Sequence, residues 1–130
     1  HRADDVARIA ALRDRLADGL LAAVPDAVET GIMGGDRSGR AAGLCHLCFP
    51  GVEAEALLFL LDQAGVAASA ASSCASGAAE PSAVLAAMGV PRDQAAGSLR
   101  LSLGWATTDA DVDLALRVVP DAVERLRAPR

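Results

Sequence analysis

The sequence predicts an α+β fold, in which a small mixed sheet is covered by helices. Two long segments, one towards each end of the chain, carry apolar residues at helical spacing, and a short segment around residue 100 alternates strictly between apolar and polar residues. The predicted order of elements is helix, strand, strand, helix, strand, a loop, helix, strand and helix, which we interpret as an α+β fold and not as a doubly wound one. A chain of 130 residues has the length of one domain, so we expect a single domain over residues 1–130.

The first element is expected to be a helix that follows two aspartates and ends near Val24-Pro25. Its apolar residues recur at steps of three and four and form one face: Val6, Ile9, Leu12, Leu16 and Leu20. A short strand is expected over 28–33, before a turn-rich segment at 34–39. A phosphate-binding loop would end in Gly-Lys-Ser/Thr, and the chain has no lysine, so a plain hairpin-like connection is the favoured interpretation.

The middle of the chain predicts a strand, a helix and a short second strand. Residues 43–49 are expected to form a buried strand, which ends at a Pro-Gly pair. The next segment opens with acidic residues, as the first turn of a helix often does, and Gly65 suits the position just after a helix C-terminus. Residues 66–68 are expected to form a short strand, and residues 81–89, which begin with proline and end with glycine, a short helix.

The last two elements have clear patterns. Residues 98–103 alternate between leucines and polar residues, which predicts a strand with Arg100 on the face opposite the leucines. The final helix is expected to begin at Thr107 or Thr108, with acidic residues near its start and arginines at its end. Pro120 is expected to kink it. Because the first and last helices each carry one continuous apolar stripe, we expect them to pack together.

Composition argues against several classes of function. The net charge is -5, no cluster of basic residues occurs and aromatic residues make up 2% of the chain, so neither a nucleic acid nor a membrane is an expected partner. The longest purely apolar run, residues 56–61, is far short of the ~20 residues that span a bilayer. Every basic residue is an arginine, so this chain has no amine with which to form a lysine Schiff base.

The ends of the chain and its cysteines predict its context. The chain opens on His1-Arg2 and not on methionine, so we expect it to be a fragment or a domain of something longer. Its three cysteines are an odd number without the spacing of a disulfide framework, which favours a reducing compartment. The cytoplasm is therefore the expected location.

Cys74 lies in a segment of small residues, Ala71-Ser72-Ser73-Cys74-Ala75-Ser76-Gly77. Ordering such a segment costs ~1–2 kcal/mol of backbone entropy per residue, and its side chains offer little apolar area in return. Cysteine is usually a buried residue, which is the alternative interpretation, but this local sequence argues against burial. We therefore expect Cys74 to be an accessible and reactive thiol on a mobile loop.

Cys45 and Cys48 have the C-x-x-C spacing found in some zinc and redox sites. On a strand, residues three apart point to opposite faces, and no second pair completes a set of four ligands. Two buried cysteines are therefore the favoured interpretation, with His46 as an interior or cleft-edge histidine and with no metal site.

Arg100 has two interpretations from its strand position. It is either a planar fork that binds a substrate carboxylate through two hydrogen bonds, or a surface arginine in an ordinary ion pair. Ser98 and Ser102, on the same face, are small enough to leave the guanidinium accessible to a cleft. Glu80 precedes Pro81 and is interpreted as an acid at a helix start in preference to a catalytic base.

Residues 65–89, in which Cys74 is followed by Glu80-Pro81-Ser82, closely resemble the catalytic-cysteine region of cysteine desulfurases of the long-loop group related to NifS and IscS. Residues 98–108 resemble that family's next strand and helix start, and residues 52–57 resemble its earlier helix. The blocks occur in the family's order. The resemblance extends over essentially the whole chain, which corresponds to the C-terminal small domain of a fold-type I pyridoxal-phosphate enzyme.

The resemblance implies a cysteine desulfurase that depends on pyridoxal 5'-phosphate. Cys74 would be the nucleophile that takes sulfur from L-cysteine as a persulfide and leaves L-alanine, and Arg100 would bind the substrate carboxylate. The family's cofactor lysine belongs to its large domain, so the chain alone is expected to bind no cofactor covalently and to be inactive. The implied partners are that large domain, a sulfur-acceptor protein and a second copy in a homodimer. Iron–sulfur cluster scaffolds, tRNA thiolation proteins and DNA phosphorothioation proteins all remain open as acceptors.

Two positions depart from the resembled family, which commonly has asparagine at the position of His46 and a helix former at that of Pro120. Alternatives of other classes also remain open. In one, the chain is a sulfur-relay or docking module, in which Cys74 accepts sulfur from another protein without catalysis of its own. In another, it is a relative of selenocysteine lyases or of aminotransferases, and an aminotransferase would not need Cys74.

Overall fold

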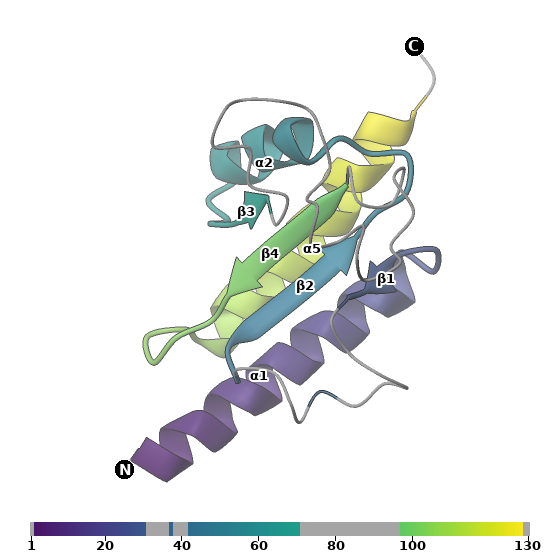
Figure 1. Ribbon diagram of the computed structural model, residues 1–130. Helices are drawn as coiled ribbons and strands as arrows, with labels where there is room; N and C mark the ends of the chain where they lie inside the picture. The colour runs from purple at the N-terminus through teal and green to yellow at the C-terminus, as the bar shows by residue number, and fades with distance from the viewer. Residues whose placement is uncertain (1, 31–36, 38–41, 71–96, 129–130) are drawn as a thin grey trace.

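The computed structural model describes residues 2–30, 37, 42–70 and 97–128, and the account below is confined to them. The elements, in chain order, are α1 (Arg2–Ala23), β1 (Val28–Glu29), β2 (Leu44–Cys48), α2 (Ala54–Gln63), β3 (Ser69–Ala70), β4 (Ser98–Ser102) and α5 (Asp109–Arg127) (Figure 1). The predicted α+β class is confirmed. No helix within the described residues is both long and apolar enough to span a bilayer.

The four strands within the described residues form one sheet in the order β1-β2-β4-β3. All three described pairings are antiparallel, so the sheet predicted as mixed is antiparallel over these residues. Apolar patterning identifies a strand but does not set its direction, which depends on how the connections place it beside its neighbour. The central ladder between β2 and β4 extends past both strands, because Leu103 N donates to Gly43 O (2.7 Å) and Phe49 N donates to Gly97 O (3.0 Å).

The helices cover one face of this sheet. In Figure 1, α5 lies behind β4 and β2, and α1 runs alongside β2. One core cluster joins residues from the three described helices to the leucines of the central strands: Leu12, Leu16, Leu20, Leu47, Leu57, Leu61, Leu99, Leu101, Val112, Val119 and Val123. Burial of apolar side chains is the main favourable contribution to such a fold. The other face of β2 and β4 lies away from this core and carries the polar residues of the strands.

The predicted packing of the first helix against the last is confirmed. A side-chain carbon at Gly19 of α1 would overlap the side chain of Leu116 on α5, so the two helices approach each other where α1 has no side chain. Arg15 of α1 forms an ion pair with Asp113 of α5. The Arg8 guanidinium donates to the carbonyl of Thr107 at 2.7 Å, which fixes the turn before α5.

The end of α2 explains why the strand predicted at 66–68 begins later. Gly65 has a positive φ of 87°, the left-handed conformation that glycine adopts readily. Gly65 N donates to Asp62 O and Val66 N donates to Leu61 O, and this pair of bonds defines a Schellman motif. The backbone N–H of Val66 is therefore used to close the end of α2, and Val66 is buried. Pairing with β4 starts only at Ser69, so the prediction of a strand at 66–68 was wrong by three residues.

The final helix begins as predicted. Thr108 is its N-cap: Asp111 N donates to the Thr108 hydroxyl, and Thr108 N donates to the Asp111 carboxylate, which completes a capping box. Pro120 lies inside α5, and the kink expected there stays a prediction. Of the strand predicted at 28–33, β1 covers the first two residues, whereas 31–36 and the helix predicted at 81–89 lie outside the described residues.

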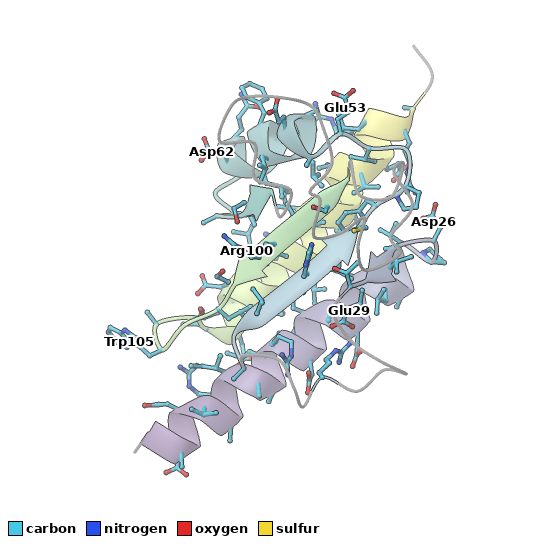
Figure 2. All side chains as sticks on the ribbon, in the orientation of Figure 1. Asp26, Glu29, Glu53, Asp62, Arg100 and Trp105 are labelled. Atoms are coloured by element: carbon cyan, nitrogen blue, oxygen red, sulfur yellow. The ribbon has the colours of Figure 1, made fainter. Side chains whose placement is uncertain are left out.

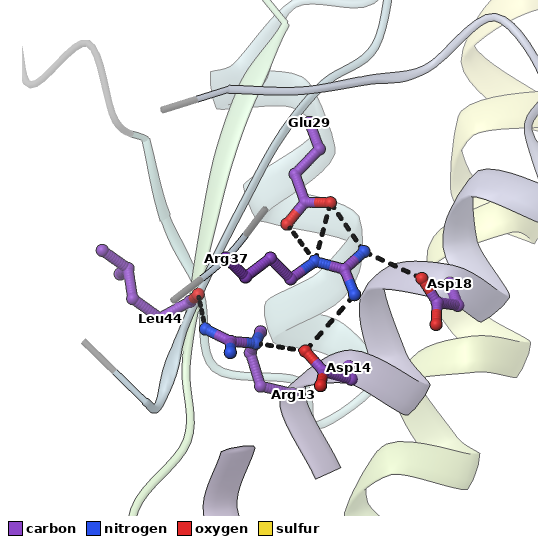
Figure 3. A network of polar contacts seen from close by, with 6 residues as sticks. All are labelled: Arg13, Asp14, Asp18, Glu29, Arg37 and Leu44. Carbon is purple, nitrogen blue, oxygen red and sulfur yellow. Dashed lines mark hydrogen bonds and ion pairs between the residues drawn. The ribbon is translucent and has the colours of Figure 1, made fainter. Parts of the chain in front are cut away.

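A polar network joins β1 to α1 (Figure 3). The side chain of Glu29 on β1 is 3% exposed, and its carboxylate accepts from the Nε of Arg37 (2.8 Å) and from a terminal nitrogen of Arg37 (2.7 Å). The same guanidinium donates to Asp18 (2.8 Å) and to Asp14 (3.3 Å). The hydrogen bond to Glu29 raises the pKa of Arg37 above its ordinary value. Arg37 thus provides the positive charge that makes burial of Glu29 possible.

Replacing Arg37 by alanine is expected to lower the free energy of unfolding by ~2–4 kcal/mol, because it leaves the buried Glu29 carboxylate without its counter-ion. Urea unfolding followed by circular dichroism measures the loss. The matched control is Arg117→Ala, an exposed arginine of α5, which should change stability by less than ~0.5 kcal/mol. Equal effects from the two variants would show that the network adds nothing beyond an ordinary surface contact.

Candidate functional site

The face of the sheet opposite the helices carries the candidate site. On β4, Leu99 and Leu101 are buried in the core, whereas Arg100 between them is exposed. The alternation predicted from the sequence, with Arg100 on the non-leucine face, is confirmed. Figure 2 shows the Arg100 side chain leaving β4 on the side of the sheet turned away from α5.

Arg100 occupies the centre of a row of three residues that we call the arginine row: Ser69, Arg100 and His46. The strand register places Ser69 of β3 on one side of Arg100 and His46 of β2 on the other. Directly paired residues on neighbouring strands share a face, with their Cβ atoms ~4.5–5.5 Å apart. The Nε of Arg100 donates to the Ser69 hydroxyl at 3.1 Å. The Nε side of the Arg100 guanidinium is thus held by Ser69 of the neighbouring strand β3.

The surroundings of Arg100 bear on its two interpretations. Among the described residues, no carboxylate lies within ion-pair distance of Arg100, although other arginines of the chain form several such pairs. Ser102, two positions along β4, is exposed, and Ser98 is fully buried. These short side chains do not screen the guanidinium. The arrangement leaves an exposed guanidinium that is able to bind a carboxylate through two hydrogen bonds.

Cys48 lies on the same face, opposite Ser98, and is completely buried. Burial raises the pKa of the Cys48 thiol to about 11. A thiol with so high a pKa is protonated at neutral pH, and the thiolate is the reactive form. Cys48 is therefore a structural residue and not a nucleophile.

Cys45 lies on the core face of the same strand, where it is fully buried, and both cysteines are free thiols. The prediction of two buried cysteines on opposite faces of a strand is confirmed. His46 between them is half-buried and belongs to the arginine row. The described residues include no group of three or more side chains suited to hold a metal ion.

The pKa of Cys48 predicts that the fold loses stability in alkali. Because the folded-state pKa of about 11 lies above the ordinary 9.0, the folded protein keeps this proton between pH 9 and 11 while the unfolded chain loses it. The contribution is therefore complete below pH 9 and falls by ~2 kcal/mol as pH rises towards 11.

The chain is suited to this measurement because it has no lysine and no tyrosine, whose titration would otherwise dominate this window. Urea unfolding of the 130-residue chain at pH 8, 9, 10 and 11 should show the fall. In Cys48→Ala the curve should be flatter over the same range, whatever its absolute stability. An unchanged slope in that variant would assign the alkaline loss to another group.

Cys74 and Glu80, predicted from the sequence as a nucleophile and a helix-start acid, lie outside the described residues. The structure does describe the residues that lead into the Cys74 segment. β3 ends at Ala70, and its two residues pair with Arg100 and Leu99 of β4. The last described residues before the Cys74 segment therefore border Arg100. The sequence did not single out Ser69, whose contact with Arg100 depends on this pairing.

Comparison with known proteins gives consistent results. The sequence model of the family Aminotransferase class-V matches residues 2–115. An IscS-like cysteine desulfurase of Mycobacterium tuberculosis is 49% identical over 95% of this chain and 31% of that protein. The cysteine desulfurase NifS of Azotobacter vinelandii is 44% identical over 90% of this chain and 28% of that protein. The chain thus spans about 30% of the length of such relatives.

Solved structures support the fold. A NifS-like protein superposes with a TM-score of 0.71 at 24% identity, over 92% of this chain and 28% of that chain. A NifS-like protein from Rickettsia africae superposes with a TM-score of 0.67 at 22% identity. At these identities the likeness concerns the fold alone. The family match over residues 2–115 shows that the chain belongs to the class-V aminotransferase family, and the sequence identities above show that it is homologous to part of the IscS and NifS cysteine desulfurases.

Proposed function

We propose that this chain is the C-terminal part of a pyridoxal 5'-phosphate-dependent cysteine desulfurase. In this proposal the full-length protein takes sulfur from L-cysteine as a persulfide on Cys74, releases L-alanine and passes the sulfur to an acceptor protein. The full-length protein would act as a homodimer. The observation that carries the proposal is Arg100, an exposed guanidinium without a carboxylate partner among the described residues, on the strand beside the approach to Cys74.

Covalent geometry sets an upper limit on the distance between Cys74 and the end of β3. Four peptide links separate Ala70 from Cys74, and an extended chain spans at most ~3.6 Å per residue, so their Cα atoms can be no more than ~14 Å apart. Ala70 pairs with Leu99, the residue next to Arg100. This limit is compatible with a thiol that reaches a substrate bound at Arg100.

Arg100 would fix the orientation of the substrate. A guanidinium is planar and always charged, and it donates two parallel hydrogen bonds to a carboxylate. With the carboxylate held at Arg100, the amino group and the thiol of L-cysteine have defined directions relative to the sheet. Arg100 would thus present the substrate sulfur to the segment that carries Cys74.

The cofactor would be held by the part of the full-length protein that this chain does not contain. The chain has no lysine and cannot form the Schiff base itself, so its residues fit the substrate and not the cofactor's attachment. When bound, pyridoxal phosphate supplies an electron sink that weakens the bonds around the substrate α-carbon. The contribution of the present chain would be to bind the carboxylate and to accept the sulfur.

The sulfur transfer balances without an external oxidant. The Cys74 thiolate attacks the sulfur of L-cysteine, an S–S bond forms, and the bond between that sulfur and the substrate β-carbon breaks. The electron pair of the broken bond remains on the substrate, which takes up a proton and leaves as L-alanine. Cys74 is then a persulfide, from which an acceptor thiol can remove the outer sulfur by the same kind of displacement.

The test uses the full-length protein that carries this chain, loaded with pyridoxal phosphate and given L-cysteine. The expected result is equimolar L-alanine and persulfide, with the extra sulfur found by mass spectrometry on the Cys74 peptide. Sulfur acquired on Cys74 only from a separate persulfide donor, without L-alanine release, would favour the relay module. A strong preference for L-selenocysteine over L-cysteine in competition would favour the lyase.

A further inference from the structure

We propose that Ser69 is a positioning residue for Arg100: by accepting the Nε–H of Arg100, it directs the two terminal nitrogens of the guanidinium towards the substrate carboxylate. The hydroxyl oxygen of Ser69 lies 3.1 Å from that Nε. This inference rests on the role proposed above for Arg100. It names a residue whose side chain would act through the arginine and not on the reacting atoms.

The geometry of the guanidinium gives the contact its consequence. An arginine can bind a carboxylate in parallel fashion along either of two edges, one that includes Nε and one formed by the two terminal nitrogens. Ser69 occupies the Nε position of Arg100. The edge that includes Nε is thereby engaged, and the end of the guanidinium formed by the terminal nitrogens is the one that would receive a carboxylate.

Ser69 is well placed to hold Arg100 because its own position is fixed by the sheet. It is half-buried in β3, and its backbone pairs directly with that of Arg100. A serine loses little side-chain entropy when ordered, whereas a free arginine loses up to ~2 kcal/mol. Without this hydrogen bond the exposed Arg100 side chain would adopt several rotamers, and it would lose this conformational entropy when the substrate binds. The serine restricts the arginine before that step.

Removal of the hydroxyl should therefore weaken carboxylate binding without removing the chemistry. In the full-length protein, Ser69→Ala is expected to raise the KM for L-cysteine about fivefold to tenfold and to change kcat by less than about twofold. Ser102→Ala is the matched control, because Ser102 lies on the same face of the sheet, two residues from Arg100, and is exposed. It should leave both constants unchanged.

A second pair of variants tests the inference even if Ser69→Ala is too unstable to assay. Threonine and valine have nearly the same shape, both suit a strand, and only threonine carries a hydroxyl. Ser69→Thr should keep the KM near that of the unchanged protein, whereas Ser69→Val should raise it as Ser69→Ala does. Equal KM values in the threonine and valine variants would overturn the inference.

Binding without turnover provides an independent readout. In calorimetric titration of the full-length protein, Ser69→Ala should weaken binding of L-alanine about fivefold and leave binding of L-alaninamide, whose carboxylate is replaced by a neutral amide, unchanged. Equal losses for both ligands would indicate general damage and would also overturn the inference.

Arg100→Ala separates failure of this inference from failure of the proposed function. If Arg100→Ala weakens L-alanine binding and Ser69→Ala does not, the assignment of Ser69 alone is wrong. If neither variant weakens it, the carboxylate site proposed at Arg100 is itself wrong. If both do, Ser69→Ala should add nothing further in the Arg100→Ala background, because the hydroxyl would then have no guanidinium to hold.

Discussion

Replacing Cys74 by alanine in the full-length protein is expected to lower the rate of persulfide and L-alanine formation from L-cysteine by at least ~10³-fold. The reason is chemical, because the alanine variant has no thiolate to attack the substrate sulfur. Binding of L-alanine should be unchanged, since Cys74 is not proposed to hold the carboxylate. Steady-state assay of L-alanine and mass spectrometry of the persulfide, with calorimetric titration of L-alanine, measure the three quantities.

The other two cysteines provide the matched controls. Cys45 and Cys48 are fully buried, on opposite faces of β2, and Cys48 has its pKa raised to about 11. Cys45→Ala and Cys48→Ala should therefore retain the activity of the folded fraction, although each leaves a small cavity and lowers stability. Full L-alanine production by Cys74→Ala would contradict the proposed role of this thiol. Transamination of the substrate at an unchanged rate in Cys74→Ala, without L-alanine release from L-cysteine, would favour an aminotransferase.

The parts of the fold that the sequence predicts well are those with a local cause. The start of α5 follows from Thr108 and Asp111, three positions apart, which close a capping box without help from distant residues. The placement of Arg100 opposite the leucines, and of Cys45 and Cys48 on opposite faces, follows from the period of a strand. In each case, residues that are close together in the sequence determine the geometry.

The parts that the sequence did not predict depend on which strands meet and in what register. Ser69 contacts Arg100 only because a two-residue strand, β3, pairs with β4 at that position, and two residues are too few to show a period. A signal was available in the Schellman motif at Gly65, which delays the strand to Ser69. The contact of Arg37 with the buried Glu29 likewise joins residues that no local pattern connects.

Replacing Arg100 by alanine is the second variant with a large expected effect, and it should lower kcat/KM for L-cysteine by ~10²–10³-fold. Two charge-assisted hydrogen bonds to a carboxylate are lost, each worth ~1.5–3 kcal/mol when shielded from water, and they do not add fully. Arg100→Lys should lose less, because it keeps the charge but not the planar fork. Arg117→Ala, an exposed arginine of α5, is the control and should have no effect.

The magnitude of this effect also tests whether Arg100 binds the carboxylate in a site that is shielded from water. Within the described residues Arg100 is exposed, and an ion pair in that setting contributes only ~0–1 kcal/mol, less than a tenfold change in kcat/KM. A loss of ~10²–10³-fold therefore requires that the remainder of the full-length protein covers this face of the sheet and excludes water around the carboxylate. L-cysteine methyl ester, which has no carboxylate, should react equally poorly with the unchanged protein and with Arg100→Ala. If Arg100→Ala instead lowered kcat/KM equally for the acid and the ester, the guanidinium would act on something other than the carboxylate.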